Sequence, residues 1–150
     1  MTDDPLASTE LTFLLGMGFQ LVLGEFVARV SAAGYADLRP VHGAVFQALK
    51  RSGATSSELA ATLGVTKQAA GQIVDELERK GYVRREPHPE GGRRKLVVLT
   101  PAAHRHLEVA GRILHELEAS LGDVSVLRAE LTRLIRSLAG ETLPALRPVW

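Results

Sequence analysis

Residues 55 to 100 read TSSELAATLGVTKQAAGQIVDELERKGYVRREPHPEGGRRKLVVLT, and this stretch decides the fold. It opens with a capping box, in which Thr55 accepts from free amides of the first helical turn and Glu58 reaches back. A short apolar face follows, made of Leu59, Ala60 and Leu63. Gly64 adopts left-handed backbone at low cost, so it ends this helix and turns the chain.

A second helix begins after Thr66, which can cap it, and ends at Gly81. Its apolar positions have helical spacing and are Ala70, Ile73, Val74 and Leu77. Two helices joined by so short a turn form a helix-turn-helix, which presents the outer face of its second helix to the DNA major groove. The residues predicted to contact DNA from this helix are Thr66, Lys67, Gln68 and Gln72.

A β-hairpin is predicted after Gly81. Residues 82–86 and 93–99 are strand candidates, and the turn formers PHPEGG separate them. Five cations lie on or beside this hairpin, where they can bind phosphate oxygens or enter a minor groove: Arg84, Arg85, Arg93, Arg94 and Lys95. The segment therefore predicts a winged helix-turn-helix at residues 40–100.

Several motifs in this order resemble the MarR family of bacterial transcription regulators. They are LRPVHGAVFQAL at 38–49, LAATLGVTKQ at 59–68, VDELERKGYV at 74–83 and GGRRKLVVLTP at 91–101. The resemblance covers nearly the whole chain. It implies a dimeric DNA-binding regulator, a repressor released by a small aromatic or phenolic ligand. One departure is Gly91, because the family usually has an Asp two residues before the wing arginine, here Arg93.

Composition suits one folded domain, with 150 residues of which 45% are hydrophobic. The net charge is only +1, but residues 50–95 hold ten Lys or Arg against six Asp or Glu, a local net charge of +4. The basic excess thus coincides with the predicted DNA module. The chain has no Cys, which excludes disulfides and thiol redox sensing.

Apolar helices flank this module and are predicted to form a dimer. The first spans residues 9–34. Thr100 is predicted to cap, and Pro101 to begin, another leucine-rich helical region over 101–140. We expect a mainly α fold with a small β wing, in one domain over 1–150 whose terminal helices dimerise. Completion of the monomer's own core by these leucines is the alternative. The apolar stretch Leu11 to Leu23 is shorter than a bilayer span, which predicts a cytoplasmic location.

Four residues are candidates for a ligand pocket between the terminal helices and the DNA module: Phe13, Met17, His42 and Phe46. Phe19 is near the same region. The alternative for each is an ordinary core position. His104, His106 and His115 lack the helical spacing of metal ligands, so we expect surface histidines and no metal or other cofactor. No nucleophile–base pair or phosphate-binding loop suggests an enzyme. The competing function is a winged helix that docks proteins, but five cations on the wing favour DNA.

Overall fold

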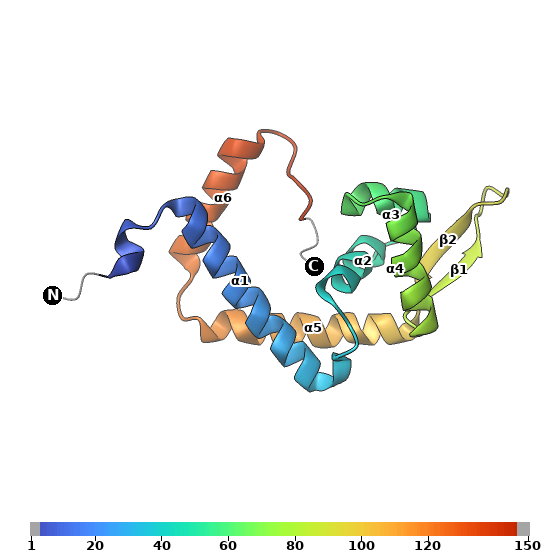
Figure 1. The fold of residues 1–150 in the computed structure, drawn as a ribbon, viewed down its shortest axis with the longest axis horizontal. Coiled ribbons are helices and arrows are strands. Elements are labelled where there is room, and N and C mark those ends of the chain that lie inside the picture. Colours follow the sequence, from blue (N-terminus) through green and yellow to red (C-terminus); the bar gives the residue numbers. More distant parts are fainter. Residues whose placement is uncertain (1–3, 147–150) are drawn as a thin grey trace.

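The structure is a computed structural model that describes residues 4–146. Its helices and strands follow the order α, α, α, α, β, β, α, α after a short 3-10 turn. They are η1 (Pro5–Ser8), α1 (Leu11–Val30), η2 (Ser31–Tyr35), α2 (Pro40–Leu49), α3 (Ser56–Leu63), α4 (Lys67–Arg79), β1 (Val83–Pro87), β2 (Lys95–Leu99), α5 (Pro101–Ser120) and α6 (Ser125–Ala139). The fold class predicted from the sequence, mainly helical with a small β wing, is confirmed (Figure 1).

The molecule has two parts joined by one long helix. Figure 1 shows α2, α3, α4 and the hairpin gathered around one end of α5, while α1 crosses α5 and α6 lies beyond the other end. The first part is called the winged module below, and the second, made of α1, the far half of α5 and α6, is called the terminal helices.

The helix-turn-helix forms as its caps and apolar spacing predict. The Thr55 hydroxyl accepts from the Glu58 amide at 3.2 Å, and the Thr66 hydroxyl accepts from the Ala69 amide at 3.0 Å. Gly64 has a φ of 69°, in the left-handed region that ends α3. Every predicted apolar position of both helices is buried: Leu59, Ala60, Leu63, Ala70, Ile73, Val74 and Leu77.

The wing is an antiparallel pair in which Val83 lies opposite Leu99 and Pro87 opposite Lys95. A third segment joins it, because Ala54 and Val97 exchange two backbone hydrogen bonds of 3.1 and 2.8 Å. Gly53 makes this approach possible, since a Cβ there would lie 2.8 Å from the Val97 carbonyl oxygen. The sequence analysis missed this third segment.

Thr100 stands at the start of α5 but does not cap it as predicted. Its hydroxyl donates instead to the Gly81 carbonyl oxygen at 2.6 Å, and the Thr100 amide donates to the Tyr82 carbonyl oxygen at 3.0 Å. These bonds fasten α5 to the end of α4, so the long helix leaves the winged module at a defined point.

The hydrophobic core lies almost entirely in the winged module. Its buried residues come from α2, α3, α4, the hairpin and the first turn of α5: Val41, Val45, Phe46, Leu49, Leu59, Leu63, Ile73, Val74, Leu77, Val83, Val97, Leu99 and Ala103. By contrast, only Val30 of α1 is buried, and none of the residues of α6 is. One chain therefore gives the terminal helices little to pack against.

Exposed hydrophobic side chains have the complementary distribution. Within residues 4–146, every exposed large hydrophobic residue lies before residue 22 or after residue 113. Leu21 is 75% exposed and Leu138 is 80% exposed. So large an apolar surface marks an interaction face.

The first helix has nearly the length predicted from the sequence, residues 9–34. Helical turns continue from Leu11 to Tyr35, with a wider last turn in which Gly34 has a φ of 108°. These 25 residues, of mean hydropathy 1.7 over the most apolar window, are long and apolar enough to cross a membrane. The apolar helix thus extends beyond the Leu11–Leu23 stretch from which the cytoplasmic location was predicted, and a single helix of this kind near the N-terminus is weak evidence for a membrane span. Glu25 and Arg29 form an ion pair of 2.9 Å on this helix, which also packs against α5.

Candidate nucleic-acid interface

The front half of α4 presents polar side chains to solvent. Lys67, Gln68 and Gln72 are exposed, whereas the next apolar positions face the core. Thr66 is exposed as well, although its hydroxyl also caps the helix. The structure thus brings the four predicted α4 residues together on one accessible surface.

The back half of α4 is acidic, but basic residues of neighbouring elements neutralise it. Arg85 of β1 donates to Asp75 at 2.7 Å and to Glu78 at 2.8 Å. Arg39, just before α2, donates to Glu76 at 2.7 Å. Among the described residues, the charges of α4 without an ion pair are therefore both positive, Lys67 at its front and Arg79 in its last turn.

Arg85 differs in this respect from the other predicted DNA contacts. Its side chain is only 26% exposed, and both of its ion pairs hold β1 against α4. Sequence reasoning could not distinguish Arg85 from Arg84, because only the fold shows which of two adjacent strand residues faces α4. Arg85 therefore joins the wing to α4 through both ion pairs, and a contact of Arg85 with DNA stays a prediction.

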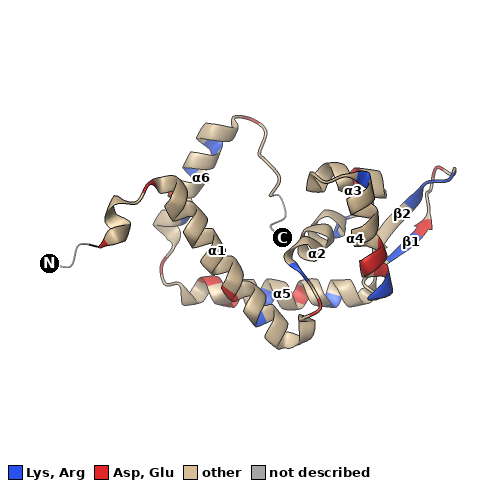
Figure 2. Ribbon diagram, in the orientation of Figure 1, with Lys and Arg blue, Asp and Glu red and all other residues tan. Residues whose placement is uncertain are grey.

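The remaining wing cations lie at the surface (Figure 2). Arg84 pairs with Glu86 at 2.8 Å, and Arg94 pairs with Glu90 at 3.4 Å. Among the described residues, Arg93 and Lys95 form no ion pair within 4.0 Å. The wing thus offers exposed cations on the hairpin, beside the polar face of α4.

The wing tip is closed by its own turn. The Gly91 amide donates to the His88 carbonyl oxygen at 2.9 Å, and the Glu90 amide donates to His88 Nδ1 at 3.2 Å. Gly91 has a φ of 78°, in the left-handed region that favours glycine. The Arg94–Glu90 pair therefore gives this wing an ion pair, although the residue two before Arg93 is a glycine.

His42 links α2 to α4. The Arg39 amide donates to His42 Nδ1 at 2.9 Å, which leaves Nε2 to carry the proton of the neutral ring, and Nε2 lies 3.2 Å from a Glu76 oxygen. Burial lowers the pKa of His42 despite the nearby carboxylate. Burial acts to raise the pKa of Glu76, but hydrogen bonds from Arg39 and His42 outweigh it, so that pKa lies below its usual value.

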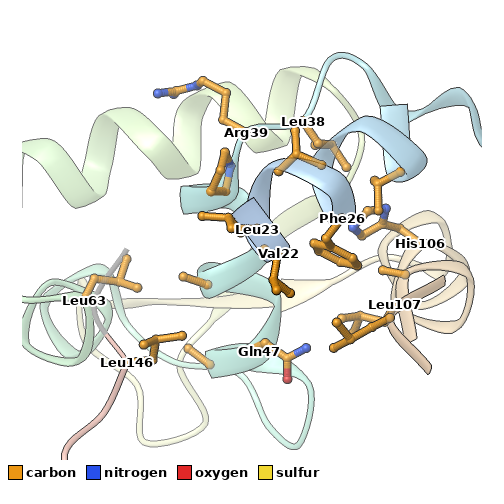
Figure 3. Close-up of a pocket in the computed structure, with 18 of the residues that line it drawn as sticks. Val22, Leu23, Phe26, Leu38, Arg39, Gln47, Leu63, His106, Leu107 and Leu146 are labelled. Atoms are coloured by element: carbon orange, nitrogen blue, oxygen red, sulfur yellow. The ribbon is translucent and has the colours of Figure 1, made fainter. Parts of the chain in front are cut away.

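A cavity of about 580 Å³ lies between the terminal helices and the winged module (Figure 3). Its wall comes from α1, α2 and the residues just before it, the end of α3, α5 and the chain near residue 146. The residues of this wall are Phe19, Val22, Leu23, Phe26, Val27, Val30, Leu38, Arg39, Pro40, Gly43, Ala44, Gln47, Ala48, Thr62, Leu63, His106, Leu107, Ala110, Leu114, Ala145 and Leu146. The cavity lies in the region predicted for the pocket, and Phe19 lines it, but the four candidate residues do not.

None of the four predicted pocket residues lines this cavity. Phe46 and His42 are fully buried in the winged module, and Phe13 and Met17 lie exposed on α1. The prediction favoured bulky side chains, whereas the α2 wall is formed where side chains are small, at Gly43, Ala44 and Ala48.

His106 was predicted to be a surface histidine, and this was wrong. It is 6% exposed, and its ring lies 4.6 Å from that of Tyr35 and 5.3 Å from that of Phe46. Burial lowers its pKa, and its Nδ1 has no hydrogen-bond partner among the described residues. Among those residues, no group of three or more His, Asp or Glu could hold a metal ion.

We expect stability to fall as the pH drops through the ordinary histidine pKa of 6.5. The folded-state pKa values of His42 and His106 are lowered, so below that pH the unfolded chain binds protons that the folded chain does not. His106→Phe removes one of the two groups and is expected to reduce the loss between about pH 7 and pH 5. Urea midpoints measure it, with exposed His104→Gln as the control. An unchanged pH dependence in His106→Phe contradicts this.

Comparison with known proteins agrees with this geometry. The MarR family model matches residues 36–94, which contain α2 to the end of the wing loop. The transcriptional regulator BldR from Sulfolobus solfataricus is 26% identical, with a TM-score of 0.68 over 86% of this chain and 92% of that chain. CouR from Rhodococcus jostii bound to p-coumaroyl-CoA is 23% identical, with a TM-score of 0.68 over 94% of this chain and 99% of that chain.

A second CouR structure holds a 23-mer DNA duplex. CouR is described there as a transcriptional repressor, and the structure is 22% identical with a TM-score of 0.73, over 93% of this chain and 99% of that chain. None of the curated proteins matches this chain.

Proposed function

We propose that the protein is a dimeric, sequence-specific DNA-binding regulator of transcription of the MarR family, whose model matches residues 36–94. One observation carries the proposal: the polar face of α4 and the exposed cations of the wing lie on the same module. The fold is shared with a repressor seen on a DNA duplex, which supports DNA as the partner.

Two kinds of contact follow from the geometry. Thr66, Lys67, Gln68 and Gln72 enter the major groove, where amide side chains can pair with base edges. Arg84, Arg93, Arg94 and Lys95 bind phosphates or the minor groove beside it. Arg85 supports both by holding β1 to α4 through Asp75 and Glu78.

The dimer is supported by the apolar surface of the terminal helices. Residues 9–34 and 101–140 form the interface in this proposal, and residues 40–100 form each DNA-binding module. A two-fold axis places two α4 helices about one DNA turn apart, on an inverted repeat. Such a dimer buries the apolar length of α1, which favours a cytoplasmic protein over a membrane-spanning one.

The cavity supports an effector site. It is mostly apolar and lies between the terminal helices and the winged module. A ligand there can change the position of the winged module relative to the terminal helices. We propose that a small aromatic or phenolic ligand binds there. CouR, which shares this fold, has a structure bound to p-coumaroyl-CoA, which supports a ligand with a phenolic group. Release of DNA requires that the ligand bind the DNA-free form more tightly. Repression is the proposed outcome, with no catalytic step.

The experiment is fluorescence anisotropy with the DNA upstream of the protein's own gene and a scrambled duplex, from about 50 to 200 mM salt. Tight, salt-dependent binding that favours the upstream fragment supports the proposal. Equal, weak binding to both duplexes contradicts the proposed sequence specificity. No binding at low salt favours a winged helix that docks proteins instead.

Arg93→Ala is expected to weaken binding to both duplexes alike and to reduce the salt slope by about one unit, because it removes one phosphate contact. Gln72→Ala is expected to weaken binding to the upstream fragment by about 1–3 kcal/mol, with little effect on the scrambled duplex. The same titration measures both. If the two substitutions lower affinity for both duplexes equally, the assigned roles are wrong.

A further inference from the structure

The chain after α6 returns to the winged module. It leaves α6 at Gly140, which has a φ of 67° and so permits a sharp change of direction. Figure 1 shows the following segment running back from α6 toward α2 and α3. Its last described residues, Ala145 and Leu146, line the large cavity, and Figure 3 shows Leu146 between Leu63 of α3 and Gln47 of α2. A segment distant in sequence therefore reaches the edge of the cavity.

No polar contact explains this return. Among the described residues, no hydrogen bond or ion pair joins residues 141–146 to another part of the chain. Pro144 has no amide hydrogen to donate and does not continue a helix. Leu143 and Leu146 are 57% and 80% exposed, so neither side chain fills the cavity. The contact of this segment with the winged module is thus apolar and incomplete.

Four more residues follow, and they bring an aromatic side chain within reach of the cavity. Residues 147–150 read Arg-Pro-Val-Trp and lie outside the described residues. Four extended residues reach about 13 Å from Leu146, which is enough to cross a cavity of about 580 Å³. Pro148 disfavours a helical conformation at the residue before it, so an extended course is expected.

We propose that residues 147–150 fold into the large cavity and that the indole ring of Trp150 occupies it. The wall fits an indole, because it is mostly apolar and includes Phe26 and Leu107 (Figure 3), and a tryptophan side chain can bury about 150–250 Å². A buried indole N–H usually has a hydrogen-bond partner. Gln47 and Thr62, both exposed on the wall, offer side-chain oxygens as acceptors.

The docked segment competes with any other occupant of the cavity. A ligand then binds only those molecules whose cavity is open, so its apparent dissociation constant rises by the inverse of that fraction. This consequence for an effector rests on the proposed function. Docking of the segment does not rest on it, since docking needs neither DNA nor a ligand, and a protein that fails to bind DNA leaves the tests below unchanged.

Intrinsic fluorescence tests the proposal in the full chain, because Trp150 is the only tryptophan of the sequence. Burial in an apolar cavity shifts indole emission to shorter wavelength and shields the ring from acrylamide. If the segment is docked in about nine molecules of ten, acrylamide is expected to quench Trp150 several-fold less than it quenches N-acetyltryptophanamide. Emission and quenching like those of the free amide overturn the proposal.

Gly43→Leu distinguishes docking in this cavity from burial elsewhere. Gly43 lines the cavity, and a Cβ added there meets no atom within 4 Å, so leucine can extend into the cavity. We expect this variant to expel Trp150, with emission at longer wavelength and stronger quenching. Gly71→Leu on α4 is the matched control, since Gly71 is equally open but outside the wall, and it keeps wild-type emission. A folded Gly43→Leu protein in which Trp150 stays shielded overturns the proposal and favours burial against a second copy.

A dye supplies a readout that does not depend on Gly43→Leu. Anilinonaphthalene sulfonate fluoresces when it binds an apolar cavity. Trp150→Ser and deletion of residues 147–150 are both expected to tighten its binding about tenfold, because the cavity is then open in every molecule instead of one in ten. Trp150→Phe keeps a ring and is expected to retain most of the competition, and Arg147→Gln is the control with wild-type affinity. Equal dye affinity in the wild type and Trp150→Ser contradicts docking.

Discussion

Phe46→Ala is expected to lower the free energy of unfolding by about 3–5 kcal/mol. Phe46 is completely buried at the centre of the winged module, and its ring lies 5.6 Å from that of Tyr82 and 5.3 Å from that of His106. Truncation leaves a cavity that α2 and α5 cannot close without moving the start of the wing. Because small domains have total stabilities of about 5–15 kcal/mol, much of the protein is expected to unfold at moderate temperature.

Urea denaturation followed by circular dichroism measures this loss. Phe46→Leu is the matched control, since it keeps most of the apolar volume and is expected to lose much less stability. A loss of stability below about 1 kcal/mol for Phe46→Ala would mean that neighbouring side chains fill the cavity. Phe46 would then not be central to the hydrophobic core.

The second large effect is expected from Leu21→Glu combined with Leu138→Glu. Both leucines are more than two-thirds exposed in one chain, at 75% and 80%, and lie on helices with little buried surface. If they face a second copy, two buried charges per subunit prevent association. Loss of the second DNA-binding module then lowers affinity for the inverted repeat by about 10²- to 10⁴-fold.

Sedimentation velocity measures the oligomeric state, and anisotropy measures the affinity. Arg105→Glu, an exposed change on α5, is the control and is expected to sediment like the wild type. Because the core lies in the winged module, the double variant is expected to stay folded by circular dichroism. A double variant that remains dimeric shows that these leucines serve another purpose.

The parts of the fold that sequence predicted are those with local causes. Caps at Thr55 and Thr66, the left-handed turn at Gly64 and the apolar spacing from Ala70 to Leu77 act within a few residues, so their pattern is visible in the sequence. The order of helices and the wing followed from them.

What could not be predicted depends on contacts between distant segments. Ala54 pairs with Val97, and Thr100 bonds to Gly81 rather than capping its own helix. His106 is buried because Tyr35 and Phe46 cover it. No local signal distinguishes these residues from their exposed neighbours.

The candidate site shows the same division. Exposure of Lys67, Gln68 and Gln72 followed from the helical period. The role of Arg85 depends on Asp75 and Glu78 ten and seven positions earlier, and the cavity wall depends on where small residues of α2 face α1 and α5. The prediction was based on bulky residues such as Phe13. On α2, however, space for a ligand exists because the residues that line it, Gly43, Ala44 and Ala48, are small.

The length of α5 sets the mechanical scale of any regulation. Its 20 residues span about 30 Å, so a tilt of about 5° at one end displaces the other end by roughly 2.6 Å. Since Thr100 fastens this helix to Gly81 and Arg85 fastens β1 to α4, the wing and α4 travel with it as one body. A sub-ångström change where α1 meets α5 is therefore magnified at α4 and the wing. In the proposed function these elements contact a duplex of fixed helical repeat, which tolerates little such displacement.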